Sequence, residues 1–305
     1  MDVSHLSLLR ELAERGSITA VAEATHRTPS AVSQQLKTMQ RELGAPLVER
    51  HGRGVRLTSA GNTLAAAAVD VATALSTAQA VWDEFRGSNS GTVDLVLFPS
   101  AGQLLLPRLL AKEDLLSGIE LRCDDRDVRT EAFAALTADA DIVVAHHVFE
   151  PPPWTGSRLT AVPLLREPLD IALPEDHPLA AKTTCSPRDV RGERWIGVPE
   201  GFPFDHLVKQ IGDLAGQPVT VVQRLRDNRI IEALVAAGHG ISVLPRYAQA
   251  ATPGSGVVLR PITGLKAGRR MVALMRPDRA ERRAVRQVLR GLTEAAAEIT
   301  AGDSS

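Results

Sequence analysis

Four side chains near the N-terminus bring hydroxyl, amide and cationic groups together at helical spacing: Ser30, Ser33, Gln34 and Lys37. If a helix begins at Thr28, these side chains lie mainly on its outer face. Hydroxyl and amide groups can hydrogen-bond to base edges, and a lysine ammonium group can pair with a phosphate. The segment therefore predicts a surface that fits a DNA groove, although the same residues taken alone also suit an ordinary solvated helix face.

An arginine-rich segment follows, from Arg50 to Thr58, with two glycines that favour a tight turn. We expect a small hairpin whose arginines, Arg50 and Arg53 among them, can reach a minor groove, where the negative potential is strong. The whole chain has a formal net charge of −1, which excludes a uniformly basic protein. Between Arg27 and Thr58, however, six basic residues stand against two acidic ones, so positive charge is concentrated in this segment.

Three helices are expected to position these residues. Residues 3–15 place leucines on one side and stop at Gly16, and Ser17 can cap a second helix that runs to Ala24. Thr28 followed by Pro29 is a strong start signal for the third helix, because threonine caps well and proline suits the first helical position. The apolar residues of the third helix are expected to pack inward, namely Ala31, Val32, Leu36, Met39 and Leu43. Residues 1–58 therefore predict an all-α winged helix-turn-helix.

The same segment resembles the LysR-type transcriptional regulators over about its first sixty residues. The resemblance is carried by Gly16–Ala22, Thr28–Lys37, Glu42-Leu43-Gly44, Pro46-Leu47, Arg50, Arg53, Val55, Leu57-Thr58 and Ala60-Gly61. It implies a sequence-specific regulator that binds double-stranded promoter DNA. The candidate DNA-contacting residues are then Ser17, Thr19, Thr28, Pro29, Ser30, Ser33, Gln34, Lys37, Arg50 and Arg53.

Residues 59–87 are rich in alanine and contain no proline, which predicts one long linker helix. Larger and smaller apolar residues recur there in steps of four and three: Leu64, Ala68, Val71, Leu75, Ala78, Trp82 and Phe85. This is the spacing of a heptad seam between two helices, although a helix packed on its own chain shows the same periodicity. The resemblance favours pairing and implies a homodimer through the 59–87 helix, with a homotetramer as a further assembly.

From residue 91 onward, segments typical of strands alternate with segments typical of helices, which predicts a parallel sheet with helical crossovers. The family resemblance continues more weakly in Leu105-Leu106-Pro107, Ala140-Asp141-Ile142, His177–Ala180 and Val235–Pro245. It implies an α/β, two-lobed effector domain over residues 91–300, similar to periplasmic binding proteins. Lobe I would comprise about 91–161 and 265–300, and lobe II about 162–264.

A candidate ligand site lies where the first strand of this domain ends, at Ser100, Ala101 and Gly102. Because a helix begins there, the Ser100 hydroxyl and the adjacent N–H groups could cradle an anion, although Ser100 also fits a plain helix cap. The family pattern places an unidentified small-molecule effector in the cleft between the lobes, and the anion cradle at Ser100 suits an anionic effector. The expected lining residues are Ser100, Ala101, Gly102, His146, Phe202, Phe204 and Asn228.

Three arginines, Arg224, Arg226 and Arg229, could neutralise an acidic effector, although arginines near a helix start are usually solvated. Neighbouring His146 and His147 point to different sides, so they do not predict a metal chelate. We expect no metal and no cofactor.

The two cysteines, Cys123 and Cys185, fit a reducing cytoplasm, and a redox switch between them would require a large approach of the two lobes. We expect a cytoplasmic protein without membrane contact, since no stretch was found to approach the roughly 18 apolar residues of a membrane span. Two other functions remain alternatives: an enzyme with an accessory DNA-binding domain, and a small-molecule binding protein. The sequence contains no nucleophile elbow, phosphate loop or dinucleotide fingerprint that would indicate an enzyme.

Overall fold

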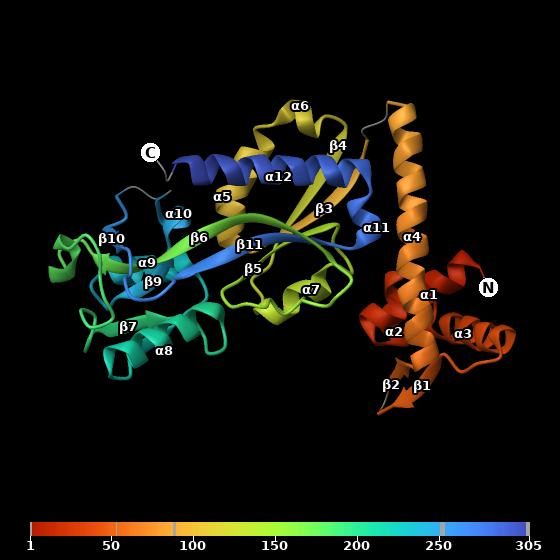
Figure 1. Cartoon of the computed structure of the whole chain (residues 1–305), viewed down its shortest axis with the longest axis horizontal. Helices are drawn as coiled ribbons and strands as arrows, with labels where there is room; N and C mark the ends of the chain where they lie inside the picture. Colours follow the sequence, from red (N-terminus) through yellow and green to blue (C-terminus); the bar gives the residue numbers. More distant parts are fainter. Residues whose placement is uncertain (1, 53, 88–89, 251–253, 303–305) are drawn as a thin grey trace.

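The structure, a computed structural model, describes residues 2–52, 54–87, 90–250 and 254–302. Three parts follow one another along the chain (Figure 1): a small helical head formed by residues 2–57, one long helix, and a larger α/β body. The head and the long helix stand at one end of the molecule, and the body extends away from them.

The head packs three helices around an apolar core. Helices α1 (Val3–Arg15), α2 (Ile18–Ala24) and α3 (Pro29–Leu43) begin at Asp2, Ser17 and Thr28, and each of these caps accepts a backbone N–H through its side chain. Strands β1 (Val48–His51) and β2 (Gly54–Leu57) form the expected hairpin. Ala31 is exposed, not buried as expected, because each residue turns the helix by about 100° and the neighbouring Val32 takes the inward position.

The long helix α4 (Ser59–Phe85) begins at the Thr58 cap and crosses the head closely. A Cβ atom at Gly61 would lie 2.1 Å from the Leu47 carbonyl oxygen, so only glycine permits this approach. Ala68 is 2% exposed within its own chain and therefore does not belong to a free seam, which corrects that part of the heptad prediction. The exposed apolar residues lie farther along the helix, at Leu75, Ala78, Val81, Trp82 and Phe85.

Helix α4 is also long and apolar enough to cross a membrane by length and composition, with a window of mean hydropathy 1.4. This corrects the expectation that no segment approaches such a length. Only 17% of that window is buried within the chain, so most of it is exposed. The Asp70 carboxylate on this helix pairs with Arg158 at 2.7 Å, and a charge at that position is costly in hydrocarbon.

The body is built on one mixed seven-stranded sheet with the order β10–β6–β11–β5–β3–β4, and β9 pairs with β6. Only β3, β4 and β5 run parallel to one another in this sheet, so the prediction of a parallel sheet is wrong for the rest. The long β6 and β11 run antiparallel side by side, and residues 175–267 lie between them along the chain. The strands are β3 (Gly91–Leu97), β4 (Ile119–Asp125), β5 (Ile142–His147), β6 (Thr160–Pro174), β9 (Ser242–Pro245), β10 (Val257–Arg260) and β11 (Gly268–Met275).

Two hydrophobic cores divide the body into lobe I, which includes Val93–Leu97 and the C-terminal helix, and lobe II, which includes Ile171 and Trp195. The change of core falls inside β6, between Leu165 and Leu169. Figure 1 shows β6 and β11 passing from one lobe to the other, so these two strands form the hinge region.

Lobe I carries α5 (Pro99–Leu110), α6 (Glu113–Leu116), η1 (Thr130–Ala132), α7 (Phe133–Leu136), α11 (Pro277–Ala280) and α12 (Arg283–Gly302). Lobe II contains the parallel pair β7 (Arg194–Gly197) and β8 (Thr220–Arg224), together with η2 (Pro178–Ala181), α8 (Pro203–Ala215) and α9 (Asn228–Ala236). Helix α10 (Arg246–Ala250) follows β9.

Candidate nucleic-acid interface and ligand cleft

The start of α3 presents a polar, exposed face. The Thr28 hydroxyl accepts the Ala31 N–H at 3.2 Å, which fixes the first turn, and Pro29 occupies the first helical position. Ser30, Gln34 and Lys37 are exposed along this helix, and Ser33 is half-buried. The structure therefore gathers hydroxyl, amide and ammonium groups on one outward surface.

The wing lies beside this surface. Strands β1 and β2 pair antiparallel with Arg50 opposite Val55, and the Arg50 side chain is exposed. Gly52 supplies the left-handed conformation of the turn at φ 57°. Arg56 is committed to an ion pair with Glu49 at 2.6 Å. The other predicted wing residue, Arg53, lies outside the described residues.

Two predicted contact residues lie on α2. Ser17 caps this helix by accepting the Ala20 N–H at 3.4 Å, and Thr19 is exposed. Arg27 is a further exposed cation near α3 and donates to Gln35 at 2.6 Å. Arg27 belongs to the local positive charge of this segment. The sequence did not predict it as a DNA contact, because helical periodicity does not indicate which way a turn residue points.

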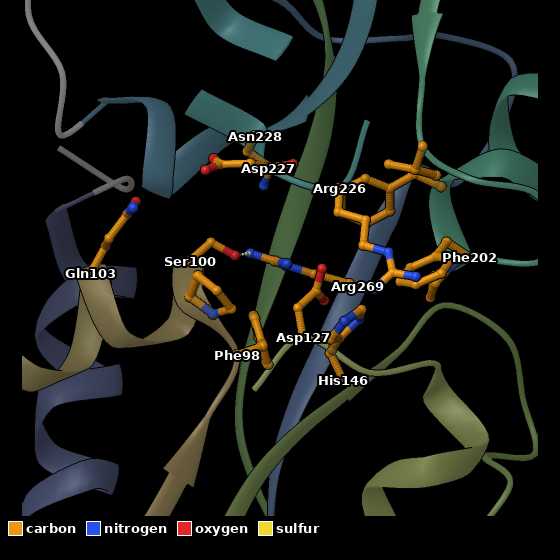
Figure 2. A pocket seen from close by; sticks show the side chains of 14 residues that line it. Phe98, Ser100, Gln103, Asp127, His146, Phe202, Arg226, Asp227, Asn228 and Arg269 are labelled. Atoms are coloured by element: carbon orange, nitrogen blue, oxygen red, sulfur yellow. Dashed lines mark hydrogen bonds between the residues drawn. The ribbon is translucent and has the colours of Figure 1, made fainter. Parts of the chain in front are cut away.

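A cavity of about 230 Å³ lies between the lobes (Figure 2). Lobe I supplies the end of β3, the start of α5 and the segment after β4, and lobe II supplies the starts of α8 and α9. The lining residues are Phe98, Pro99, Ser100, Gln103, Asp127, His146, Val198, Phe202, Pro203, Phe204, Arg226, Asp227, Asn228 and Arg269.

Arg269 lies at the centre of this cavity and comes from the hinge strand β11. Its guanidinium donates to Glu167 on β6 at 2.6 and 2.8 Å and to the Ser100 hydroxyl at 2.9 Å. It also lies 4.8 Å from the Phe98 ring centroid and 5.6 Å from that of Phe204, one ring from each lobe. Arg269 is 2% exposed and Glu167 is fully buried, so the arginine charge is balanced where the lobes meet.

His146 forms part of an aromatic cluster on the lobe I side. Its ring lies 4.5 Å from Phe98 and 5.4 Å from Phe133, and it reaches toward Phe204 at 6.4 Å. Burial, with the nearby Arg269 and His147 charges, lowers the pKa of His146 well below 6.5. The ring is therefore neutral at neutral pH, and its buried Nδ1 has no hydrogen-bond partner among the described residues.

The structure brings five of the seven predicted effector residues into this cavity: Ser100, His146, Phe202, Phe204 and Asn228. Ala101 and Gly102 are not among its lining residues, and their N–H groups both bond to the Phe98 carbonyl oxygen at 2.9 and 3.0 Å. These N–H groups are therefore not free to cradle an anion, which corrects the prediction.

Sequence reasoning missed the importance of Asp127, Gln103 and Arg269. The run of acids after β4 could have indicated Asp127, since it follows a strand end in an α/β fold. Arg269 gave no such signal, because the strand that carries it was not predicted. Of the three arginines considered for an acidic effector, only Arg226 lines the cavity, whereas Arg224 binds Asp205 at 2.7 Å.

Neither cysteine is among the residues that line the cavity, and Cys123 is exposed on the surface. Burial raises the pKa of both the Cys123 and the Cys185 thiol, which disfavours the reactive thiolate. Cys185 is fully buried in lobe II, while Cys123 lies on β4 of lobe I. No cluster of three potential metal ligands occurs among the residues that the structure describes.

Two family models match the chain. One is described as bacterial regulatory helix-turn-helix protein, lysR family, and matches residues 3–62. The other is described as LysR substrate binding domain and matches residues 86–297. Together they cover the head, and nearly all of the body.

Relatives and solved structures agree with these matches. The transcriptional dual regulator GltC of Bacillus subtilis (strain 168) is 27% identical over 282 residues, which is 92% of each chain. A full-length OxyR variant from Pseudomonas aeruginosa has a TM-score of 0.65 at 21% identity, covering 97% of this chain and 94% of that one. Full-length CbnR complexed with its target DNA has a TM-score of 0.54 at 21% identity, covering 97% and 100%. At these identities the solved structures show the fold alone.

Proposed function

This chain belongs to the LysR family of bacterial transcriptional regulators, and we propose how its own residues contact DNA, an effector and a second copy of the chain. It is a DNA-binding transcriptional regulator with an N-terminal winged helix-turn-helix and a C-terminal effector-binding domain. In this proposal residues 1–58 act as the DNA-binding unit, residues 59–87 as the linker and dimerisation helix, and residues 91–300 as the effector domain.

The outer face of α3 enters a major groove in this proposal. Ser30, Ser33 and Gln34 contact base edges, and Lys37 contacts a phosphate. Arg50 and Arg53 of the wing contact the minor groove or the backbone, and Ser17, Thr19, Thr28 and Pro29 lie at the phosphates beside the groove. The observation that carries this proposal is the exposed row of polar groups along a capped helix whose other face forms the core of the head.

A gel-shift titration tests it on DNA upstream of the chain's own gene or a neighbouring gene. We expect a specific complex whose affinity falls as salt rises, because phosphate contacts release counterions. The replacement Ser33→Ala should alter the preference among operator variants. The matched control is Ser117→Ala, since Ser117 is an exposed serine that follows α6 in the body. A complex that is insensitive to salt, or absent under every effector condition, would contradict the proposal.

The cavity between the lobes is the effector site in this proposal. Its walls come from both lobes, so a bound molecule stabilises one relative position of the lobes over others. Outside the lining, Arg129 of lobe I donates to the Glu200 carbonyl oxygen of lobe II at 3.3 Å. Ser100, His146, Phe202, Phe204 and Asn228 contact the effector from the two sides.

The exposed end of α4 pairs with a second copy of the chain. Trp82 and Phe85 are 53% and 80% exposed and stack at 5.6 Å, which leaves an apolar surface that water does not favour. A dimer aligns two heads with two half-sites one helical turn apart, and a tetramer would extend the site further. As a DNA-binding regulator of this family, the protein is expected to act in the cytoplasm.

A further inference from the structure

The charged groups that line the effector cavity are balanced. Two cations, Arg226 and Arg269, face two anions, Asp127 and Asp227. Behind Arg269 lies Glu167, fully buried and paired with it at 2.6 Å. The charged side chains that line the cavity therefore sum to zero, which favours a ligand without net charge.

Asp127 is an acceptor without a partner. The side chain is half-buried, and within the described part of the chain its carboxylate forms no hydrogen bond or ion pair. Burial raises the pKa of Asp127 against the opposing effect of Arg226 and Arg269. A half-buried carboxylate without a partner is stabilised by a cation, and aromatic rings nearby are a further favourable surface for an ammonium group. Figure 2 shows Asp127 directed into the cavity beside Phe98 and His146.

The cavity also has two places that attract a negatively charged group of a ligand, and both are helix N-termini. Helices α5 and α8 both start in the cavity with a phenylalanine followed by a proline, Phe98-Pro99 and Phe202-Pro203, and neither has a side-chain cap. A helix start attracts an anion through its dipole. At α5 this attraction does not come from the Ala101 and Gly102 N–H groups, which are bonded to the Phe98 carbonyl oxygen. At α5 the buried Ser100 hydroxyl and Arg269 lie at the same point. The buried Nδ1 of His146, without a partner among the described residues, is an additional polar group in the lining.

We propose that the cavity binds a small zwitterion, an α-amino acid with an apolar side chain, whose ammonium group pairs with Asp127 and whose carboxylate lies at the start of α5 beside Ser100 and Arg269. This proposal rests on the proposed function, since it names the ligand class of the same site. A cavity of about 230 Å³ exceeds the about 150 Å³ that holds benzene, so an amino acid of moderate size fits. The rings of Phe98, Phe202 and Phe204 provide the apolar wall.

Isothermal titration calorimetry on the full chain tests the proposal with matched probes. The panel is the twenty standard L-amino acids, and each one that binds is compared with its analogue lacking the amine, for example leucine with 4-methylpentanoate and phenylalanine with 3-phenylpropanoate. We expect at least one amino acid to bind, and its amine-free analogue to bind at least about tenfold more weakly because a charge-assisted contact is lost. Equal or tighter binding of the analogue, or no binding by any amino acid, overturns the proposal.

The variant Asp127→Asn locates the ammonium contact, with Asp125→Asn as the matched control, since Asp125 is an exposed carboxylate two residues away. We expect D127N to reduce the difference between amino acid and analogue to less than about threefold and D125N to keep it. An unchanged difference in D127N overturns the assignment to Asp127. Gel shifts without added ligand run in parallel: specific DNA binding together with amine-independent ligand binding leaves the regulator proposal standing and refutes only the zwitterion.

Discussion

Replacing Arg276 by methionine is expected to release the head from lobe I without unfolding either part. Arg276 follows β11 and is 3% exposed. Its Nη1 donates to Glu14 at 2.9 Å and to Glu11 at 3.2 Å, both on α1 of the head. A second pair, Arg10 with Asp278 at 2.9 Å, lies beside it. These are contacts between the DNA-binding part and the effector part of one chain.

The size of the effect follows from burial. Removing one partner of a fully buried ion pair costs about 3–5 kcal/mol, because the remaining charge is left uncompensated. The side chains of Glu14 and Glu11 are 27% and 15% exposed, and Glu11 keeps its bond to Arg15 at 2.8 Å. Burial already raises the pKa of Glu14 against the opposing charge of Arg276, so protonation relieves part of the cost once the arginine is gone. We therefore expect the head–lobe contact to weaken by about 2 kcal/mol, which is roughly thirtyfold.

Hydrogen exchange of the α1 amides, followed by mass spectrometry, measures this contact. The control is Arg270→Met, which removes an exposed ion pair with Glu150 and should change little, since exposed pairs contribute about 0–1 kcal/mol. Faster exchange in α1 and α11 in R276M, with lobe II unchanged, is the expected result. Equal exchange of α1 in the two variants would refute the reasoning, and faster exchange throughout the chain would show general destabilisation instead.

Four further outcomes are expected. The pKa of His146 is depressed in the folded chain, so its contribution to the free energy of unfolding is fully present above about pH 6.5. Below that pH the free energy of unfolding falls by up to about 1.4 kcal/mol per pH unit. His146→Phe should reduce this pH dependence in thermal unfolding measured from pH 7 to pH 5. Lys37→Ala should weaken binding to all operator variants alike and reduce the salt slope in gel shifts by about one, and a change of sequence preference would contradict a phosphate contact. Trp82→Glu should lower the mass of the particle in sedimentation, and an unchanged mass would place the interface elsewhere. Because burial raises the pKa of the Cys123 and Cys185 thiols, hydrogen peroxide should leave DNA binding unchanged in gel shifts, and a peroxide effect lost on Cys→Ser replacement would reverse this conclusion.

The head could be predicted closely because its signals are local. Asp2, Ser17 and Thr28 cap their helices through side-chain oxygens a few residues from the N–H groups that they satisfy. The caps at Ser17 and Thr28 and the glycines of the wing can be read from neighbouring residues alone. The prediction was wrong for Ala31. Which face of a helix is buried depends on the elements packed against it, and the sequence alone can place the edge of that face one residue off.

The body was predicted less well, since its decisive contacts join distant residues. Glu167 and Arg269 are 102 positions apart, and their pairing exists only because β6 and β11 lie side by side with these two residues opposite each other. No short-range pattern reports such a pair. Ser100 and His146, in contrast, follow or end strands of an α/β arrangement, where the rule that ligands lie at the carboxyl ends of strands gives direct guidance.

Strand β11 connects the cavity with the contact between lobe I and the head. Arg269 lies near its start, in the effector cavity, and Arg276 directly follows its end, against the head. At about 3.3 Å per residue, a single strand of the central sheet thus spans roughly 23 Å between the two contacts. Its antiparallel bonds to β5 and β6 oppose stretching, so a change of lobe position that moves Arg269 must either move Arg276 as well or be absorbed at the register shift between Met271 and Val272. We therefore infer that the ion pairs of α1 are among the contacts through which occupancy of the cleft changes the orientation of the head.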